Sequence, residues 1–468
     1  MRSCLGKAAQ RTEGKANYQR NKEAENGKRY QMVNLLFGVG GIVVLLVMIV
    51  LGTPIGIAMG LVGFVGIWLL RGWDAAIGAL YLIPHSSIAS FTLAVIPMFI
   101  LMGYLAFHLG LTDKAYEAAH KWTSGVKGGL GVATIFAAAV FGACCGSSVA
   151  ATAAFGKMAL PQMLRRGYDE RLASGCVAAA GTLAALIPPS LLFVLYAIIT
   201  EQSVGKLLIA GILPGILTAL VFALLVLLIA HLRPDLVGGK NDIEESDWKE
   251  RIRSLGGLWP VILLFLIVVA GIYSGFFNPT EAGAAGSLAC LLVGFLARRV
   301  TGKALRDVTI ETARSLAVIG VLIVGVFIFV QFISLSGLPS FLAFTVSKWS
   351  VPLPITIASV YLVYLVLGCF LDAFGLLMLT VPFFFPLVVH LGFSPIWFGV
   401  IVVKLTEIGL LTPPVGVQVY VLKSVAPEVP TEAIFKGAMW FWGADLLTIT
   451  ILTLFPSISL LLPQMMSG

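Results

Sequence analysis

Residues 182–190 read TLAALIPPS, an apolar run that ends in two adjacent prolines. Proline has no N–H group, so Pro188 and Pro189 leave the carbonyls of Ala184 and Ala185 without the donors that a helix supplies. The residue before a proline avoids the helical conformation, so a helix is expected to end at Ile187. A buried carbonyl without a partner costs about 2–7 kcal/mol unless something binds it.

The same pattern returns 225 residues later (407 minus 182), where residues 407–415 read EIGLLTPPV. Here Pro413 and Pro414 leave the carbonyls of Gly409 and Leu410 unpaired, and a second helix is expected to end at Thr412. Two helix breaks of one kind at a fixed separation indicate a repeated structure.

The composition indicates a membrane protein. The chain has 468 residues, of which 59% are hydrophobic and 12% charged, and its mean hydropathy is +0.98. A soluble protein of this length carries about a quarter charged residues. Apolar stretches of the length that crosses a bilayer, about twenty residues, recur along the chain. We therefore predict an all-α polytopic membrane protein.

The charge pattern and the absence of one motif argue against two classes of function. The net charge of +8 lies in loops and in the N-terminal region, which is typical of membrane orientation signals. Basic stripes interleaved with aromatic residues are absent, so no nucleic-acid partner is expected. The sequence contains no Walker-type phosphate loop, so ATP is not expected to drive the protein directly.

Residues 1–31 form a polar, basic N-terminal extension. It is long for the first part of a signal peptide, and no cleavage site follows the next apolar run. Two interpretations stay open: a basic cytoplasmic tail, or translation that starts at Met32.

The chain divides into two halves that resemble each other. The first half covers residues 32–231, the second covers 257–468, and a polar connecting loop is expected at 232–256. Matched positions fall 227 to 225 residues apart: Gly110 with Gly337, Lys121-Trp122 with Lys348-Trp349, Gly142 with Gly368, Pro161 with Pro386, Gly167 with Gly392, and Pro188-Pro189 with Pro413-Pro414. Matched glycines and prolines imply matched bends.

Each half is predicted to contain a hairpin followed by a broken helix. In the first half the hairpin covers 130–165 and the broken helix 171–200; in the second half they cover 356–391 and 395–423. The loop around Gly167 is rich in Lys and Arg, whereas the loop around Gly392 has neither until Lys404. Positive loops stay in the cytoplasm, so the halves should be inverted-topology repeats, as in many secondary transporters.

Small polar residues occur at the hairpin tips, where residues 142–152 read GACCGSSVAAT and residues 368–375 read GCFLDAFG. Irregular backbone at membrane depth is tolerated where it lines a cavity or is buried in protein. We predict two equivalent Na⁺ sites, one combining Gly142–Ser148 with Ala184–Ser190 and the other combining Gly368–Asp372 with Gly409–Val415. Hydroxyls of Ser147, Ser148 and Ser190 and the carboxylate of Asp372 would add oxygen ligands. The alternative is that the breaks are ordinary kinks satisfied by neighbouring helices.

An organic anion is expected near both Na⁺ sites, because helix N-termini at such breaks attract negative charge. Candidate substrate-binding residues lie at the breaks or beside them: Ser148, Thr182, Pro188, Asp372, Thr406 and Pro413.

Four stretches together resemble the large membrane subunit (M, or DctM-type permease) of tripartite ATP-independent periplasmic (TRAP) transporters. They are FGACCGSSVAATAAFGKMALPQMLRRGYD (141–169), AGTLAALIPPS (180–190), FFNPTEAGAAGSL (276–288) and EIGLLTPPVGVQVYVLKSVAP (407–427). The resemblance covers essentially the whole chain after residue 32. It implies an elevator-type fold in the bacterial inner membrane, Na⁺-driven import of an organic acid, a small membrane subunit as partner, and a periplasmic solute-binding protein that delivers substrate.

The resemblance also implies which residues hold the ions. At least two Na⁺ ions would be bound largely by backbone carbonyls, near Gly142, Ser147, Ala184 and Ile187, and near Gly368, Gly409, Thr412 and Val415. The family commonly has serine where this chain has Cys145, and a thiol is a poor ligand for Na⁺. The cysteine weakens the first Na⁺ site only if the side chain at position 145, and not its backbone carbonyl, is a ligand.

Two rival functions remain at this stage. One is a stand-alone Na⁺- or H⁺-coupled anion transporter that needs no binding protein. The other is an intramembrane hydrolase using Ser147 or Ser148, which would need a base within hydrogen-bond reach, and no histidine here lies in a recognisable catalytic motif.

Several charged and aromatic residues have more than one interpretation. Lys404 could reach toward the membrane surface, pair with Glu407 or hold an anion, and Glu407 could accept backbone N–H groups. Glu281 is expected to stabilise a helix start rather than couple ions. Trp122 and Trp349 are expected to anchor helices at the membrane interface.

Overall fold

The computed structural model describes residues 32–88, 91–111, 113–238, 247–341, 345 and 352–466. The predicted N-terminal extension 1–31 and the predicted anchor Trp349 lie outside these ranges. The described residues form helices and connecting turns, with one isolated β-bridge between Tyr168 and Val237. The all-α fold class is therefore confirmed. The chain falls into two compact units, Met1–Ala89 with Gly320–Ser350, and Ser90–Ile319 with Val351–Gly468.

Seven helices in the described ranges are long and apolar enough to cross a membrane: Met32–Val50, Val204–Leu232, Trp248–Tyr273, Pro279–Leu296, Gly302–Ser336, Ala373–His390 and Thr431–Leu454. A bent pair, Glu170–Leu186 and Leu191–Thr200, makes an eighth span if it is counted as one. The helix axis bends by 43° at the break between the two helices. The predicted polytopic membrane architecture is confirmed.

The first unit consists of the helix Met32–Val50, α2 (Ile55–Arg71), α3 (Trp73–Ile88) and the last part of α17 (Gly302–Ser336). Glycines let α2 approach the backbone of α17 closely. A Cβ on Gly56 would lie 2.7 Å from Leu322 Cα, and one on Gly63 would lie 2.7 Å from Phe329 N. Small residues at such contacts are typical of helices that pack in a membrane.

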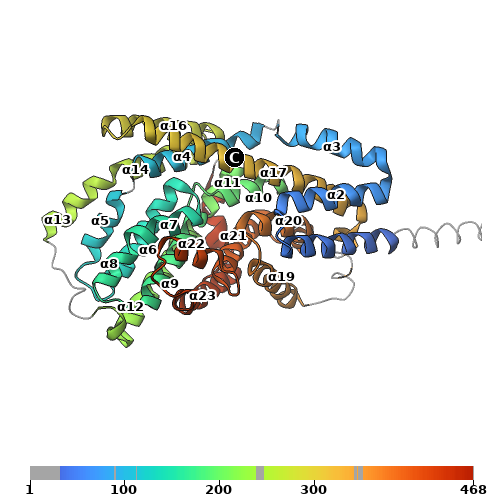
Figure 1. The fold of residues 1–468 in the computed structure, drawn as a ribbon. Helices are drawn as coiled ribbons and strands as arrows, with labels where there is room; N and C mark the ends of the chain where they lie inside the picture. Colours follow the sequence, from blue (N-terminus) through green and yellow to red (C-terminus); the bar gives the residue numbers. More distant parts are fainter. Residues whose placement is uncertain are drawn as a thin grey trace, which may run out of the picture. The chain divides into compact units, whose positions relative to one another are not determined.

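The second unit contains both predicted hairpins and both broken helices (Figure 1). The first set is α6 (Gly129–Cys145), α7 (Ser148–Met158), α8 (Leu160–Arg165), α9 (Glu170–Leu186) and α10 (Leu191–Thr200). The second set is α19 (Leu353–Gly368), α20 (Ala373–His390), α21 (Pro395–Leu411) and α22 (Val417–Val425). The breaks fall at Ile187 and Thr412, both in extended conformation, and each Pro-Pro bond is cis. The two predicted helix ends are therefore confirmed.

The remaining elements of this unit surround these two sets. They are η1 (Phe91–Ala94), α4 (Val95–His108), α5 (Asp113–Thr123), α11 (Val204–Ala210), α12 (Ile212–Leu232), η2 (Pro234–Leu236), α13 (Trp248–Leu255), η4 (Gly256–Leu258), α14 (Trp259–Phe265), η5 (Leu266–Ala270), α15 (Gly271–Tyr273), α16 (Pro279–Leu296), the first part of α17, α23 (Thr431–Leu454) and α24 (Ser457–Met465).

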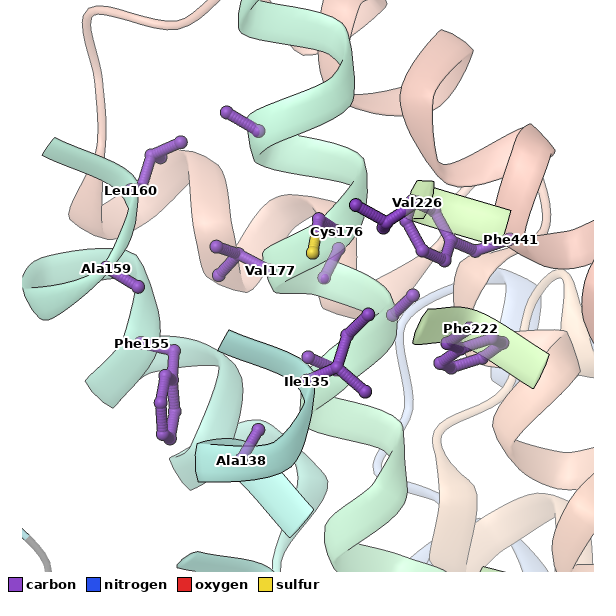
Figure 2. Packing of buried hydrophobic residues seen from close by; sticks show 14 of the residues in the cluster. Ile135, Ala138, Phe155, Ala159, Leu160, Cys176, Val177, Phe222, Val226 and Phe441 are labelled. Carbon is purple, nitrogen blue, oxygen red and sulfur yellow. The ribbon is translucent and has the colours of Figure 1, made fainter. Parts of the chain in front are cut away.

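The core of the second unit lies around α9. This helix packs against α6, α7 and α23, and its side chains from Leu172 to Leu186 are buried (Figure 1). Figure 2 shows Cys176 and Val177 of α9 among Ile135, Phe222 and Phe441. The rings of Phe222 and Phe441 meet edge to face at 5.4 Å between centroids. Dense packing on every side of α9 fixes where its broken end lies.

The connecting segment departs from the prediction of a polar loop over 232–256. Its second part is the helix α13, Trp248–Leu255. Trp248, Ile252 and Leu255 recur at helical spacing, which gives the segment an apolar face that the overall polarity conceals. Its first part is tied to the turn before α9, because Tyr168 bridges Val237 and the Asp169 N–H donates to the Leu236 carbonyl at 3.0 Å.

Glu281 begins α16 as the sequence indicated. Its carboxylate accepts the Asn278 N–H at 2.9 Å while the Asn278 side chain accepts the Glu281 N–H at 2.9 Å, a reciprocal capping box. The structural interpretation of Glu281 is therefore confirmed.

Asp169 caps α9 outside the membrane-spanning segments. Its carboxylate accepts the Arg171 N–H and guanidinium at 2.9 Å, and that guanidinium holds the pKa of Asp169 below its usual value. Asp169→Ala should lower stability at neutral pH by about 0.5–2 kcal/mol. Because the pKa of Asp169 is lower in the folded state, its carboxylate stabilises the fold at pH values above its pKa in the unfolded chain, about 4. The difference in stability between Asp169→Ala and the wild type should therefore shrink as the pH falls below 4. Thermal unfolding at pH 7 and pH 3 checks this; a constant gap would contradict it.

Candidate functional site

The first hairpin tip touches the first broken helix backbone to backbone. A Cβ on Gly142 would lie 2.6 Å from Ala184 Cα, and one on Gly146 would lie 2.1 Å from the Pro189 carbonyl oxygen. Gly146 has a φ of +60°, and it ends α6 so that Ser147 can start α7. The stretches Gly142–Ser148 and Ala184–Ser190 are thus brought together as predicted.

The second hairpin tip makes the equivalent contact. A Cβ on Gly368 would lie 2.7 Å from Gly409 Cα, and one on Gly409 would lie 2.7 Å from Gly368 Cα. Since Gly368 matches Gly142 and Gly409 matches Ala184, the two halves repeat one junction. In each, the end of a hairpin helix rests on the last turn before a Pro-Pro break.

Carbonyls without donors gather at both junctions. Within the described residues, no hydrogen bond reaches the carbonyl oxygens of Ala184, Ile187, Gly368, Thr412 or Val415. Such oxygens are hard ligands, which suit an ion like Na⁺. These five predicted ligands therefore have the free acceptor capacity that the hypothesis requires.

The other predicted carbonyls already accept a bond. The Gly409 carbonyl accepts the Thr412 N–H at 3.0 Å, so the prediction that Pro413 leaves it unpaired is wrong. The last turn of α21 tightens, and the donor three residues on replaces the one that proline lacks. The Gly142 carbonyl accepts the Gly146 N–H at 3.1 Å. The Ser147 carbonyl accepts the Ala151 N–H at 3.0 Å and also the Cys145 thiol at 3.7 Å.

Polar side chains at the junctions mostly cap helices. Ser147 accepts the Ala150 N–H at the start of α7, Ser190 accepts the Phe193 N–H at the start of α10, and Asp372 accepts the Phe374 N–H at the start of α20. Ser147 and Asp372 therefore have equivalent positions in the two halves. An N-cap side chain remains beside the helix N-terminus, where the partial charge is positive.

The remaining substrate candidates differ in what they contact. The Thr182 hydroxyl donates to the Ala179 carbonyl of its own helix at 2.6 Å. The Thr406 hydroxyl is buried, and no hydrogen-bond partner for it is found among the described residues. Pro188 and Pro413 lie in the breaks themselves, and the Thr412 hydroxyl accepts the Trp442 indole N–H at 3.1 Å.

A hydrogen bond joins the two halves at this site. The Ser148 hydroxyl, in the first turn of α7, donates to Glu407 Oε1 at 2.9 Å in the last turns of α21. The expectation that Glu407 accepts backbone N–H groups is therefore wrong, because its hydrogen-bonded oxygen accepts a side-chain hydroxyl from the other half instead. The second oxygen, Oε2, is buried with no hydrogen-bond partner in the described residues.

Lys404 is fully buried and forms an ion pair with Asp445 of α23. Its ammonium group also lies 5.4 Å from the centre of the Phe222 ring. Of the three interpretations of Lys404, neither pairing with Glu407 nor reaching the membrane surface is correct. Lys404 fixes α21 to α23 instead, one turn before Glu407.

The sequence interpretation missed Asp445 and Gln418. Both are fully buried, and both Gln418 side-chain polar atoms have no partner in the described residues. Asp445 is a single acid within the apolar stretch that begins near residue 433. The rule that singled out Asp372, that an acid inside an apolar run is functional or paired, applies to Asp445 equally and would have found it.

Comparisons with known proteins agree with this geometry. Residues 42–458 match the family described as "Tripartite ATP-independent periplasmic transporter, DctM component". The chain is 33% identical to the C4-dicarboxylate TRAP transporter large permease protein DctM of Pseudomonas aeruginosa, with 80% of this chain and 86% of that protein covered. It is 29% identical to the sialic acid TRAP transporter large permease protein SiaM of Vibrio cholerae, with 89% and 96% covered.

A solved structure shares the fold. The YdaH transporter of Alcanivorax borkumensis, described as having an unusual topology, aligns with a TM-score of 0.54 at 15% identity, covering 83% of this chain and 88% of that one. The relatives are named as transporter permeases, which sets the hydrolase alternative aside. The matched family model, the identity to large permease proteins and the repeated helix breaks lead to one conclusion: the chain belongs to the DctM family of large permease subunits of TRAP transporters, multi-pass membrane proteins that are not enzymes.

Proposed function

We propose that this chain is the transporting subunit of a Na⁺-coupled importer of organic acids in the bacterial inner membrane. It would take its substrate from a periplasmic solute-binding protein and work beside a small membrane subunit, without ATP. The relatives are named for C4-dicarboxylates and for sialic acid, both of which are carboxylates. A carboxylate is therefore the substrate class that we assign.

The observation that carries the proposal is the repeated junction between hairpin tip and broken helix. The contact of Gly142 with Ala184 and that of Gly368 with Gly409 are matched in the two halves, and carbonyls without donors lie at both junctions: Ala184 and Ile187 at the first, Gly368 and Thr412 at the second. Half-helix C-termini carry partial negative charge, so a Na⁺ ion at each junction would compensate both the dipole and the unpaired oxygens. Two junctions support at least two ions.

The ions would prepare the site for an anion. Two bound Na⁺ ions would place positive charge beside the N-termini of α7 and α20, where first-turn backbone N–H groups have no acceptor within the helix. A carboxylate bound there would lie close to Ser148, Thr406 and the breaks. Ion and substrate would then favour each other's binding, which is what coupling requires.

Movement of the whole site would complete transport. We assign inverted orientations to the two halves, with the turn near Gly167 in the cytoplasm and the turn near Gly392 in the periplasm, from their unequal positive charge. In an elevator mechanism the unit that carries both junctions would shift across the membrane with its cargo.

Uptake into proteoliposomes tests the proposal. They would contain this chain with its small subunit, and labelled organic acids would be supplied with and without an inward Na⁺ gradient and the binding protein. Uptake that requires both the gradient and the binding protein supports the tripartite mechanism. Uptake without the binding protein would replace it with the stand-alone transporter, and uptake driven equally well without Na⁺ would contradict the ion assignment.

Ser147→Ala and Thr412→Ala are expected to lower the apparent Na⁺ affinity about tenfold each. Each substitution removes an acceptor at the site: Ser147 now accepts the backbone N–H of Ala150, and Thr412 accepts the indole N–H of the Trp442 side chain. Uptake measured against Na⁺ concentration checks this. Ser147→Thr and Thr412→Ser keep the hydroxyls and should remain close to wild type; unchanged Na⁺ dependence in both alanine variants would remove these residues from the sites.

A further inference from the structure

A small polar cavity lies between α5 and α13, apart from the transport site. Its volume is about 190 Å³, and it is lined by Lys114, Glu117, Ala118, Lys121, Arg253, Ser254 and Gly257. Three cationic side chains and one carboxylate leave a lining charge of +2. Glu117 is held at 3.4 Å from Lys121, one turn apart on α5. The cavity therefore suits a compact anion.

The backbone around the cavity is shaped to hold its cations in place. A Cβ on Gly257 would lie 2.8 Å from Lys114 Cδ, so the lysine stem occupies the space that a side chain would fill. The Ser254 hydroxyl donates to the Arg251 carbonyl at 2.7 Å in the last turn of α13. The end of α13 thus places Arg253 in the lining of the cavity, and η4 packs against the Lys114 stem that lines the same cavity.

Two tryptophans stand beside the cavity. The Trp122 indole N–H donates to the Arg251 carbonyl at 3.1 Å, and the Trp122 and Trp248 rings meet edge to face with centroids 6.2 Å apart. The Arg251 guanidinium lies 5.4 Å from the Trp248 ring centre. Tryptophan with a polar contact at one end and apolar surroundings at the other is typical of the headgroup region of a membrane.

Apolar side chains are exposed next to the same cavity. Ile252 of α13 is 63% exposed, and Leu255, Trp259 and Ile262 are exposed in sequence along α13 and α14. None of the α13 side chains is buried, although Trp248, Ile252 and Leu255 are large and apolar. Helix α13 lies beside α5 at the start of an apolar helical segment (Figure 1). A charged cavity joined to an exposed apolar surface matches a lipid, with its headgroup at one end and its chains at the other.

Contacts place this cavity on the side of the basic turn 165–171. The segment that follows α12 pairs with that turn through Tyr168 and Val237. The end of α12 contacts the start of α6, since a Cβ on Gly128 would lie 3.0 Å from Ala230 Cβ. The Thr123 hydroxyl, at the end of α5, donates to the Gly129 carbonyl at 2.7 Å. The positive-inside rule assigns this side to the cytoplasm, whose leaflet is rich in anionic lipid.

We infer that the cavity between α5 and α13 binds the phosphate headgroup of an anionic phospholipid. Lys114, Lys121 and Arg253 contact the phosphate, and Glu117 lowers the affinity and selects against a second negative charge. The acyl chains lie along the apolar surface of α13 and α14. The lipid joins α5, which packs against α6 of the first hairpin, to α13 of the segment that connects the halves. This inference is independent of Na⁺ coupling.

Native mass spectrometry of the full chain in detergent tests this lipid site. The probes are dioleoyl phosphatidylglycerol and dioleoyl phosphatidylcholine, titrated separately. The wild type should bind phosphatidylglycerol about tenfold or more tightly, since each cation near a headgroup contributes measurably to the affinity. The triple variant Lys114→Gln, Lys121→Gln, Arg253→Gln should lose this preference. Glu117→Gln, which removes the opposing charge, should bind phosphatidylglycerol several-fold more tightly than the wild type.

The matched control removes three exposed cations elsewhere: Lys157→Gln, Arg165→Gln and Lys303→Gln. It has the same net charge as the first triple variant and should keep the preference. An equal loss in both triples would reduce the effect to general electrostatics and overturn the site. So would a wild type with no preference between the two lipids, or displacement of phosphatidylglycerol by inorganic phosphate at the same concentration, which would identify a free-anion site. If the first triple variant fails to fold, Glu117→Gln still decides, because unchanged affinity in it contradicts the inference.

Discussion

Lys404→Met should destabilise the protein by about 3–5 kcal/mol, the largest effect that we expect from a single substitution. Lys404 and Asp445 are both fully buried, and they pair with each other. Removing the ammonium group leaves the Asp445 carboxylate without a counter-charge in a low-dielectric interior, beside the buried carboxyl group of Glu407. Asp445→Leu should destabilise the protein by a similar amount, because it leaves the buried Lys404 ammonium group without a counter-charge.

The double variant Lys404→Met, Asp445→Leu should recover most of the lost stability. Apolar residues of similar volume can replace a buried ion pair at little cost, whereas half a pair cannot be tolerated. Thermal unfolding of the full chain in detergent, followed by tryptophan fluorescence, measures all three variants. A double variant as unstable as either single one would show that the pair does not act as a unit.

Helix α23 supplies a matched control for this pair. Lys436 and Glu432 form an ion pair at 2.7 Å on the same helix, with side chains 61% and 77% exposed. Lys436→Met should leave the melting temperature almost unchanged, because water screens exposed pairs. The contrast isolates burial as the cause.

Gly142→Ala and Gly368→Ala should each reduce Na⁺-dependent uptake at least tenfold. The new methyl group would lie 2.6 Å from Ala184 Cα in the first case and 2.7 Å from Gly409 Cα in the second. Both neighbours are backbone atoms, which cannot rotate away, so the hairpin tip must separate from the broken helix. Forcing an extra methyl into a packed contact costs about 1–3 kcal/mol, and here the separation also moves the carbonyls proposed to hold Na⁺.

Gly443→Ala is the matched control for these two variants. Gly443 also lies in a helix of the second unit, but a Cβ there would meet nothing within 4 Å. It should transport and melt like the wild type or slightly better, since alanine favours a helix. Uptake and melting temperature are both measured, so that unfolding is distinguished from loss of ion binding. Wild-type Na⁺ affinity in Gly142→Ala and Gly368→Ala would remove the junctions from the mechanism.

The helix breaks could be predicted because they are properties of the local backbone. Pro188 and Pro413 lack a donor wherever they occur, so the chain must leave the helix at Ile187 and Thr412. Membrane spans could be predicted for a similar reason, since length and hydropathy alone define them. The Gly409 carbonyl shows the limit of that argument, because a tightened last turn supplied a donor from within the same segment.

Contacts between the halves could not be predicted in this way. Ser148 and Glu407 are 259 residues apart, and nothing in either local sequence specifies that their helices meet. The partner of Lys404 depends on which face of α21 lies against α23, a property of packing that a uniformly apolar helix does not reveal. Asp445 is different: its position in an apolar run was visible, and only the choice of partner needed the structure.

The contact of Gly368 with Gly409 is made by main chain on both sides, and this has a consequence for the ion selectivity of the proposed Na⁺ site. Side chains adapt to a larger or smaller ion by changing rotamer, but two peptide segments in contact have no such freedom. An ion site bounded by them would have dimensions set by covalent geometry and by the packing behind it. At the proposed Na⁺ site, we therefore expect the paired main chain of Gly368 and Gly409 to favour discrimination among alkali cations by ionic radius. Substitutions on the outer surface of these helices can vary freely without retuning that selectivity.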